Sequence, residues 1–214
     1  MQKMDNYNLV VIGGGSAGLV SAYIAATVKA KVALIERHKM GGDCLNYGCV
    51  PSKALIHTAK YIHSLKHPEK YGVRSVSFDF DFSAVMDRVH EKIKMIEPHD
   101  SINRYEGLGV RCFQEEAVIV DRYTVQTPSQ TFKTKNIILA LGASPFVPPS
   151  IKGLSDIDYL TSENLWNLRE LPKKLVVLGG GPIGCEMAQA FARLGSQVTQ
   201  VEMTSRLMNK EDED

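Results

Sequence analysis

Short apolar runs alternate with longer stretches of helical periodicity along the chain, a pattern typical of strands connected by helices. An apolar run at 9–12 is followed by a small-residue helix and a second apolar strand, and the same order returns from residue 175. Between the two copies, apolar residues three and four positions apart after Ser83 predict a helix that ends or kinks at Pro98. This alternation predicts an α/β fold built from βαβ units.

Further elements are predicted between and after the two copies. Three short segments predict strands of a small additional sheet, at 110–113, 117–120 and 123–125. A proline-rich stretch at 144–150 predicts the crossing to a second domain, so that the domains span 1–148 and 149–214. Beyond the crossing, Ser162 is expected to cap a helix that runs through Leu168 and buries Trp166.

The two copies match residue by residue. Leu-Val-Val-Ile-Gly-Gly-Gly-Ser-Ala-Gly at 9–18 returns as Leu-Val-Val-Leu-Gly-Gly-Gly-Pro-Ile-Gly at 175–184, and the second strand of each copy ends in a glutamate, Glu36 and Glu202. In such a unit the first glycine permits a tight turn, the second lets the backbone approach a pyrophosphate and the third lets the helix meet the strand. The helix N-terminus favours the anion, and the glutamate accepts from a ribose hydroxyl.

A lone G-x-G-x-x-G is weak evidence, but here each copy follows a strand, opens a helix and carries the acid at the expected distance. We therefore expect two dinucleotide sites. Their predicted contact residues are Gly13, Gly15, Ser16, Ala17, Gly18, Glu36 and Arg37 in the first copy, and Gly179, Gly181, Pro182, Ile183, Gly184 and Glu202 in the second. Glu202 favours NAD, because its carboxylate would repel a 2′-phosphate, although Arg206 keeps NADP open.

Two cysteines lie between the copies, in the segment Gly-Gly-Asp-Cys-Leu-Asn-Tyr-Gly-Cys-Val-Pro-Ser-Lys at 41–53. The spacing of Cys44 and Cys49 lets the sulfurs close a small ring, helped by Gly48, which has no Cβ to restrict φ. A short ring constrains the unfolded chain little and is easily reduced when strained. The pair is therefore predicted to open and close as a redox disulfide.

The surroundings of Cys49 favour a thiolate there. Pro51 is suited to a first helical turn, so that Cys49 would lie at the positive end of a helix. Lys53 follows four residues later, beside the thiolate or facing a cofactor. Two alternatives are a metal site, for which no two further ligands lie nearby because Cys112 and Cys185 stand alone, and a pair of ordinary buried thiols.

Two dinucleotide motifs flanking such a cysteine pair resemble the class I pyridine nucleotide-disulfide oxidoreductases, which include dihydrolipoamide dehydrogenase, glutathione reductase and mercuric reductase. The resemblance covers essentially the whole chain and includes Ile-Ile-Leu-Ala-Leu-Gly at 137–142 as a second flavin segment. It implies a three-layer, Rossmann-like FAD-binding domain with a small β-sheet insertion, followed by an incomplete NAD(P)-binding Rossmann domain. It also implies FAD at the first site and NAD(P)H at the second.

The resemblance implies residue roles as well. Cys44 matches the thiol that exchanges with the substrate, Cys49 the thiol that contacts the flavin, Lys53 the lysine beside flavin N5, and Glu186 the partner of that lysine. Glu186 also follows Gly184 on a helix that is otherwise small or apolar, where an unpaired charge would be costly; a solvent-facing glutamate is the alternative. The implied flavin contacts beyond the first glycine motif are Gly41, Gly42, Asp43, Cys44, Cys49, Lys53, Ala117, Ala140, Leu141 and Gly142.

Some positions depart from the family pattern. Leu141 stands where a threonine or serine is usual, so a hydroxyl is lost. Pro182 replaces an aromatic residue that covers the flavin in some members. Ser52 is closer to the lipoamide and mercuric branches than to the glutathione branch.

Family members continue through a dimerisation domain that carries a His-Glu pair. We therefore expect the N-terminal part of a longer homodimeric enzyme, interrupted at 211–214 and inactive by itself, whose substrate is a dithiol, a disulfide or a metal ion such as Hg(II). None of the six histidines lies in a motif resembling the family base, and surface positions are preferred for all of them. The rival reading is a noncatalytic flavin- or nucleotide-binding module.

Charge and hydropathy limit which classes of partner and which cellular locations are expected. With 25 basic and 24 acidic residues the formal net charge is +1, which provides no field for nucleic acid or an anionic membrane. The polar N-terminus is unlike a signal peptide, and the first apolar run is far shorter than a spanning helix. We expect small-molecule partners, a cytoplasmic protein and no metal site.

Overall fold

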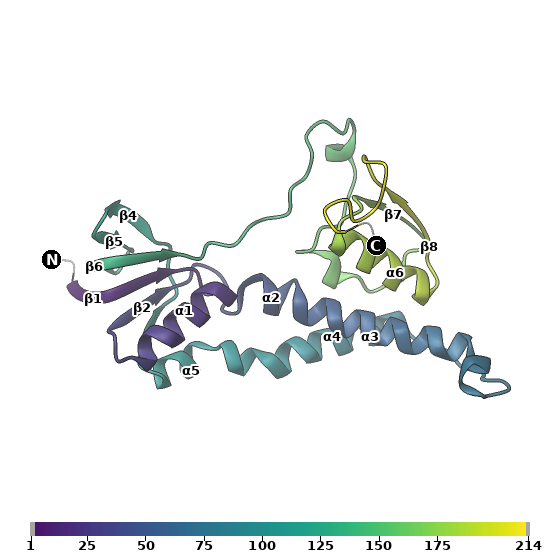
Figure 1. The fold of residues 1–214 in the computed structure, drawn as a ribbon, viewed down its shortest axis with the longest axis horizontal. Helices are drawn as coiled ribbons and strands as arrows, with labels where there is room; N and C mark the ends of the chain where they lie inside the picture. The colour runs from purple at the N-terminus through teal and green to yellow at the C-terminus, as the bar shows by residue number, and fades with distance from the viewer. Residues whose placement is uncertain (1–2, 213–214) are drawn as a thin grey trace. The chain divides into compact units, whose positions relative to one another are not determined.

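The computed structural model describes residues 3–212. Figure 1 shows strands and helices alternating along the chain, as the sequence predicts. The strands are β1 (Lys3–Ile12), β2 (Val32–Ile35), β3 (Val110–Phe113), β4 (Val118–Asp121), β5 (Thr124–Gln126), β6 (Gln130–Leu139), β7 (Lys174–Leu178) and β8 (Gln197–Val201). The α-helices are α1 (Ser16–Thr27), α2 (Gly42–Asn46), α3 (Cys49–Lys66), α4 (Phe82–Ile96), α5 (Ile102–Gly107) and α6 (Pro182–Leu194).

The described chain divides into two compact units, residues 1–50 with 93–163 and residues 51–92 with 164–214. These units do not follow the order of the two predicted domains, because the segment from 51 to 92 groups with the C-terminal part. The boundary between 148 and 149 stays a prediction.

The first unit contains a six-stranded sheet in the order β3-β2-β1-β6-β5-β4. The strands β3, β2, β1 and β6 are parallel, whereas β5 and β4 run antiparallel to their neighbours. The expectation that β3, β4 and β5 form a small separate sheet is wrong. Val110 pairs with Val32 at one edge of the main sheet, and the β4–β5 hairpin extends the sheet from β6 at the other edge.

The sheet is apolar on both faces, because successive residues of a strand point to opposite sides. Val11 packs with α1 in one buried cluster, which also includes Tyr105 of α5. Val10 packs in a second cluster on the other face, together with Phe132. The sheet is thereby fixed, and the carboxyl ends of β1, β2 and β6 meet at one edge.

The second unit contains the second βαβ copy. β7 and β8 form a two-stranded parallel sheet connected by α6, which confirms the predicted unit. Helices α3, α4 and α6 contribute its core, where Phe82 and Phe191 lie with ring centres 6.2 Å apart. Met86 and Leu55 are fully buried in the same unit.

Helix α4 confirms the helix predicted after Ser83, but Asp81 provides its cap. The Asp81 carboxylate accepts from the backbone N–H of Ser83 at 2.8 Å and from its hydroxyl at 2.7 Å. These bonds hold the pKa of Asp81 below its usual range. After α4 the chain forms a 3-10 turn, Glu97–Asp100, at the predicted proline.

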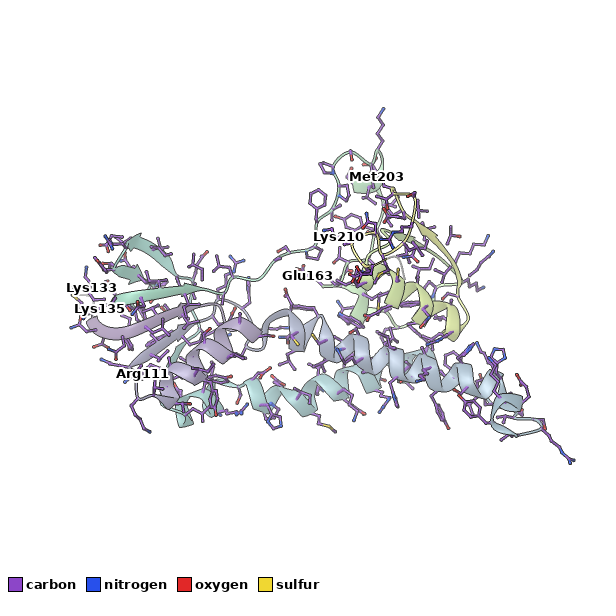
Figure 2. The ribbon with its side chains drawn as sticks, viewed as in Figure 1. Arg111, Lys133, Lys135, Glu163, Met203 and Lys210 are labelled. Atoms are coloured by element: carbon purple, nitrogen blue, oxygen red, sulfur yellow. The ribbon has the colours of Figure 1, made fainter. Side chains whose placement is uncertain are left out.

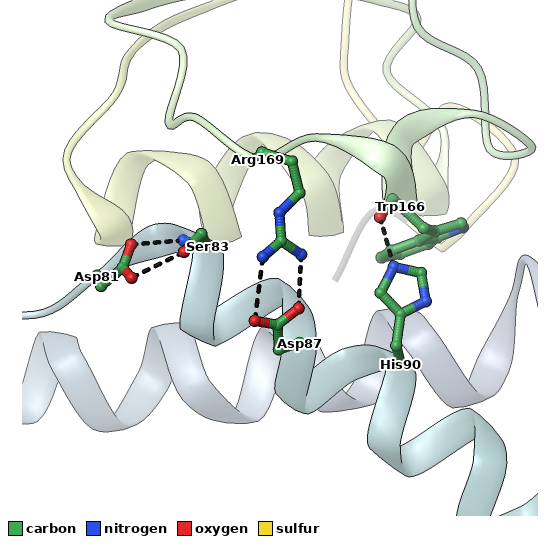
Figure 3. A network of polar contacts seen from close by, with 6 residues as sticks. All are labelled: Asp81, Ser83, Asp87, His90, Trp166 and Arg169. Carbon is green, nitrogen blue, oxygen red and sulfur yellow. Dashed lines mark hydrogen bonds and ion pairs between the residues drawn. The ribbon is translucent and has the colours of Figure 1, made fainter.

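The helix predicted from Ser162 to Leu168 is wrong, although Trp166 is buried as expected. Only a 3-10 turn forms, Leu165–Asn167, and Leu168 is extended. Figure 3 shows why the segment lies flat along α4: Arg169 donates to both carboxylate oxygens of Asp87, at 2.6 and 3.0 Å, and His90 Nε2 donates to the Trp166 carbonyl at 3.0 Å. These tertiary contacts outweigh the local helix signal.

No helix in residues 3–212 is both long and apolar enough to cross a membrane.

Candidate functional site

The first glycine motif forms the turn between β1 and α1. Gly13 has a left-handed φ of +109°, and its N–H donates to the Ile35 carbonyl at 2.8 Å. A Cβ on Gly13 would lie 2.1 Å from the Ala140 carbonyl oxygen, and a Cβ on Gly18 would lie 1.8 Å from the Gly13 carbonyl oxygen. The fold itself therefore requires glycine at both positions.

Gly15 differs from these two glycines, because the fold does not require it. Its φ of −83° and ψ of −173° are open to any residue, and a Cβ there would make only an ordinary contact, 3.6 Å from Gly42 Cα. A side chain at Gly15 would occupy the space in front of the N-terminus of α1. That space suits a pyrophosphate held by backbone N–H groups and the helix dipole.

Glu36 closes the turn from the end of β2. Its carboxylate oxygens accept from the backbone N–H groups of Gly14 and His38, each at 2.6 Å. Each oxygen has a second lone pair, so the carboxylate stays able to accept from a ribose hydroxyl. Arg37 is exposed and lies 4.0 Å from Glu116, next to Ala117 in the chain.

Two further segments converge on this turn at the carboxyl edge of the sheet. Gly41 N–H donates to the Gly14 carbonyl at 2.8 Å, and a Cβ on Gly42 would lie 2.6 Å from Gly15 Cα. A Cβ on Gly142 would lie 3.6 Å from an Asp43 carboxylate oxygen. The structure thus brings together the segments 13–18, 41–43 and 140–142, with glycine backbone and the Asp43 carboxylate between them.

The two cysteines of the predicted redox pair lie on successive helices. Cys44 is on α2 and partly exposed, and Cys49 is the first residue of α3 and exposed; no disulfide joins them in this structure. Between them, Gly48 N–H donates to the Asp43 carbonyl at 2.5 Å, and a Cβ on Gly48 would lie 3.5 Å from Cys44 Cα. The φ of Gly48 is not left-handed, so the backbone freedom expected from the sequence is not used; a Cβ there would instead lie 3.0 Å from the Asp43 carbonyl oxygen.

Cys49 lies at a position that favours negative charge on its sulfur. It stands at the N-terminus of an 18-residue helix, where the helix dipole favours negative charge, and Lys53 lies exposed one turn further on the same helix. Cys112 provides the contrast, because burial, and secondarily the charge of Glu106, raise the pKa of its thiol to about 11. Cys112 therefore stays protonated and unreactive at neutral pH.

The second glycine motif repeats the geometry of the first. Gly179 has a φ of +106°, and Glu202 accepts from Gly180 N–H at 2.5 Å and from Thr204 N–H at 2.7 Å. The Thr204 hydroxyl adds a third bond to Glu202 at 2.9 Å. Donation by the Thr204 and Gly180 backbone, followed by the Thr204 hydroxyl, lowers the pKa of Glu202 and keeps it ionised.

Gly181 matches Gly15. Its φ of −76° and ψ of 178° are open to any residue, and no described atom lies within 4 Å of a Cβ placed there. Pro182 is the first residue of α6, exposed next to Ile183. The Arg206 guanidinium donates to the carbonyls of Glu211 and Asp212, at 2.6 and 3.3 Å.

Lys53 and Glu186 are not brought together. Both side chains are exposed, and residues 3–212 contain no ion pair between them. The expectation that Glu186 lies among apolar groups is wrong, because α6 buries its other side through Met187, Ala188 and Phe191. The partnership of Lys53 and Glu186 stays a prediction carried by the resemblance alone.

Two residues that shape these sites were not predicted. Asn46 Nδ2 donates to the carbonyls of Met40 and Gly42, at 3.0 and 2.9 Å, and so folds the loop before Cys44. Thr204 fixes Glu202 as described above. An amide or hydroxyl two residues after the functional residue was the available signal in both cases.

A hollow of about 450 Å³ lies elsewhere, near the amino-terminal ends of β1 and β6, and three of its lining residues are Lys31, Lys133 and Lys135. Figure 2 shows Lys133 and Lys135 at that end of the sheet. The glycine turns lie at the carboxyl ends of their strands, where ligands of open α/β sheets bind. The hollow is therefore separate from the candidate cofactor sites.

Comparison with known proteins matches residues 7–214 to the family described as pyridine nucleotide-disulphide oxidoreductase. A mercuric reductase from Lysinibacillus sphaericus is 36% identical over 208 residues, which cover 97% of this chain and 38% of that protein. A dihydrolipoyl dehydrogenase from Acholeplasma laidlawii is 34% identical over 220 residues, covering 97% of this chain and 63% of the relative. The chain thus spans less than two thirds of the length of these relatives.

A solved structure gives the same result for the fold. The HOCl-induced flavoprotein disulfide reductase RclA from Escherichia coli superposes with a TM-score of 0.81 at 31% identity, over 97% of this chain and 45% of that one. This likeness confirms the predicted Rossmann-like α/β architecture.

Proposed function

The chain belongs to the pyridine nucleotide-disulphide oxidoreductase family, and from this premise we propose that it carries the flavin site and the redox-active cysteine pair of an FAD-dependent disulfide oxidoreductase. NAD(P)H is the electron donor, or NAD(P)⁺ the acceptor when the reaction runs in reverse, and NAD is favoured over NADP. The electrons pass between the nicotinamide, the flavin and the Cys44–Cys49 pair, and then to a dithiol, a disulfide or a metal-ion substrate.

The fold does not require glycine at Gly15 or at Gly181, and this observation is the main support for the proposal. Each lies directly before a helix, in a backbone conformation that every residue adopts, with room for a Cβ. A glycine that the fold does not need is explained by close approach of a ligand to the backbone. Two such glycines, each beside a carboxylate fixed by the turn, support two dinucleotides.

The residues of the first turn would bind and orient FAD. The N-terminus of α1 would hold the pyrophosphate, Glu36 would accept from the ribose, and the segments 41–43 and 140–142 would let the backbone approach the rest of the cofactor. When bound, FAD accepts a hydride equivalent and passes on two electrons. Fixed geometry replaces chance encounters between the reacting groups.

The cysteine pair would carry these electrons onward. Two electrons break the sulfur–sulfur bond of the oxidised pair, and uptake of one proton then leaves one thiol and one thiolate. Cys49, at the positive end of α3, is the sulfur best suited to remain a thiolate facing the flavin. Cys44, the other sulfur of the pair, is then the one that exchanges with the substrate, the role that the family resemblance implies.

The test is the visible spectrum of the protein that carries this sequence, purified with its flavin, before and after anaerobic addition of two electron equivalents. We expect a new long-wavelength band on reduction, from charge transfer between the Cys49 thiolate and the flavin. Cys44→Ser should show the band without reductant, because Cys49 is then free to ionise, and Cys49→Ser should never show it.

The controls separate the alternatives. A flavin spectrum without the band in any variant would refute the disulfide mechanism and favour the noncatalytic flavin-binding module. No bound flavin would refute the assignment of the first turn. Cys112→Ser is the matched control and should behave as the parent protein does, because burial keeps that thiol protonated.

A further inference from the structure

Outside the cofactor motifs, two imidazole rings meet at the end of α3. His63 lies in the last turn of the helix, and His67 follows directly after its last residue, Lys66. The two ring centres are 4.5 Å apart and the ring planes are tilted by 58°. Both rings are partly exposed, so that a solvent ion has access to them.

The separation of the rings is that of two imidazoles on one ion. A metal–nitrogen bond is about 2.0 Å long and the ring centre lies about 1.2 Å behind the nitrogen, so two rings at a right angle hold their centres about 4.5 Å apart. Right angles between neighbouring ligands are typical of the tetragonal coordination of Cu(II) and Ni(II). The observed distance between the ring centres therefore matches such a pair, and chelation requires one nitrogen of each ring to face the shared ion.

Glu69 lies beside one of the two rings. Its carboxylate oxygen lies 3.6 Å from His67 Nδ1, too long for a hydrogen bond, and the His67 side chain is 43% exposed. Because the carboxylate faces Nδ1, the other nitrogen, Nε2, is the one that would bind a metal ion. Metal-binding histidines usually have such a partner at the second nitrogen.

Opposing charges limit the affinity of the pair. Lys66, Lys70 and Arg193 lie close enough to act on His63 and would repel a dication, although exposure screens them. Residues 3–212 contain no group of three or more His, Cys, Asp or Glu side chains that could hold a metal. Two protein ligands with water in the other positions make an open, exchangeable site.

We propose that His63 and His67 form a two-imidazole binding site for a divalent transition-metal ion. Cu(II) is the preferred ion, because it binds nitrogen ligands most tightly among the divalent first-row metals and accepts the right-angle arrangement. Glu69 positions His67, and water completes the coordination. The site is independent of the proposed flavin chemistry, since it shares no residue with it.

The test is titration of the 214-residue chain with Cu(II) at pH 7, followed by calorimetry and electron paramagnetic resonance. Cys44 and Cys49 are replaced by serine in every sample, because thiolates bind and reduce Cu(II). We expect one ion bound with a spectrum typical of nitrogen ligands. His63→Ala and His67→Ala should each weaken binding at least tenfold, and Glu69→Gln by a smaller factor.

The matched control is His57→Ala, which removes an exposed histidine from the same helix and should leave Cu(II) affinity unchanged. Circular dichroism checks that α3 persists in each variant. Equal affinity in the parent and in the His63→Ala/His67→Ala double variant would overturn the proposal, as would absence of Cu(II) binding. Unchanged affinity in Glu69→Gln would overturn the role of Glu69.

Discussion

The two glycine turns share one backbone course but have different surroundings. Gly13 and Gly179 have φ of +109° and +106°, and in each copy the carboxylate of the glutamate accepts from the N–H of the second glycine in the row, Gly14 or Gly180. Around the first turn, β1 is flanked by β2 and β6, and Val10 and Val11 are fully buried. Around the second turn, β7 pairs only with β8, in a two-stranded sheet of the described residues.

The side chains of β7 reflect that difference, since Val176 is 62% and Leu178 53% exposed. No described atom lies within 4 Å of a Cβ placed on Gly179, whereas a Cβ on Gly13 would strike the end of β6. The comparison teaches that the turn, the helix start and the bond to the glutamate are set by local sequence. Neighbouring strands add the packing that makes the same turn intolerant of change.

The largest expected effect follows from this contrast. Gly13→Ala meets both a left-handed backbone and a close approach to Ala140, so we expect a loss of about 3–5 kcal/mol in the free energy of unfolding. Gly179→Ala meets the backbone penalty alone, about 1–2 kcal/mol. Urea unfolding measured by circular dichroism tests the first, and fluorescence of Trp166, the single tryptophan, tests the second. Equal losses would break the comparison.

A smaller effect on stability is expected where a later segment of the chain donates a hydrogen bond to each turn. Gly41 N–H donates to the Gly14 carbonyl, and Met208 N–H donates to the Gly180 carbonyl; both residues have a left-handed φ, +85° and +54°. Met208 therefore has the strain that Gly41 avoids.

We expect Met208→Gly to stabilise the chain by about 0.5–1 kcal/mol, because glycine removes that strain. Gly41→Ala should destabilise it by about 2–3 kcal/mol, since its Cβ would lie 2.6 Å from Leu45 Cβ. Thermal or urea unfolding of both variants measures the difference. A loss of stability in Met208→Gly would contradict the account.

The smallest effect is a pH dependence of the second turn. The pKa of Glu202 is lowered by its hydrogen bonds, so the stability it contributes is present above the pKa of a glutamate in the unfolded chain, about 4.3. That contribution is lost as the pH falls through the lower, folded pKa. Hydrogen exchange of the Gly180 amide should speed up in that window, and in Glu202→Gln at all pH values. If hydrogen exchange of the Gly180 amide were the same in Glu202→Gln as in the parent, the hydrogen bond between Gly180 and Glu202 would be refuted.

The sequence predicted the two βαβ units, the glycine turns and the helix that starts at the second cysteine, because these depend on residues close in the chain. The sequence did not predict that β3 joins the main sheet, because Val32 and Val110, which pair there, lie far apart in the chain. The helix expected at 162–168 failed for the same reason, because Asp87 and His90 bind that segment from α4. Exposure of Glu186 likewise depends on which face α6 buries.

Binding of FAD at the first turn can be measured by FAD titration of the protein after its flavin has been removed. Gly15→Ala is compared with Gly181→Ala, because both substitutions fit the fold without strain or collision. We expect Gly15→Ala to abolish FAD binding or to weaken it at least tenfold, and Gly181→Ala to bind FAD as the parent does. Parent-like FAD affinity in Gly15→Ala would contradict this expectation.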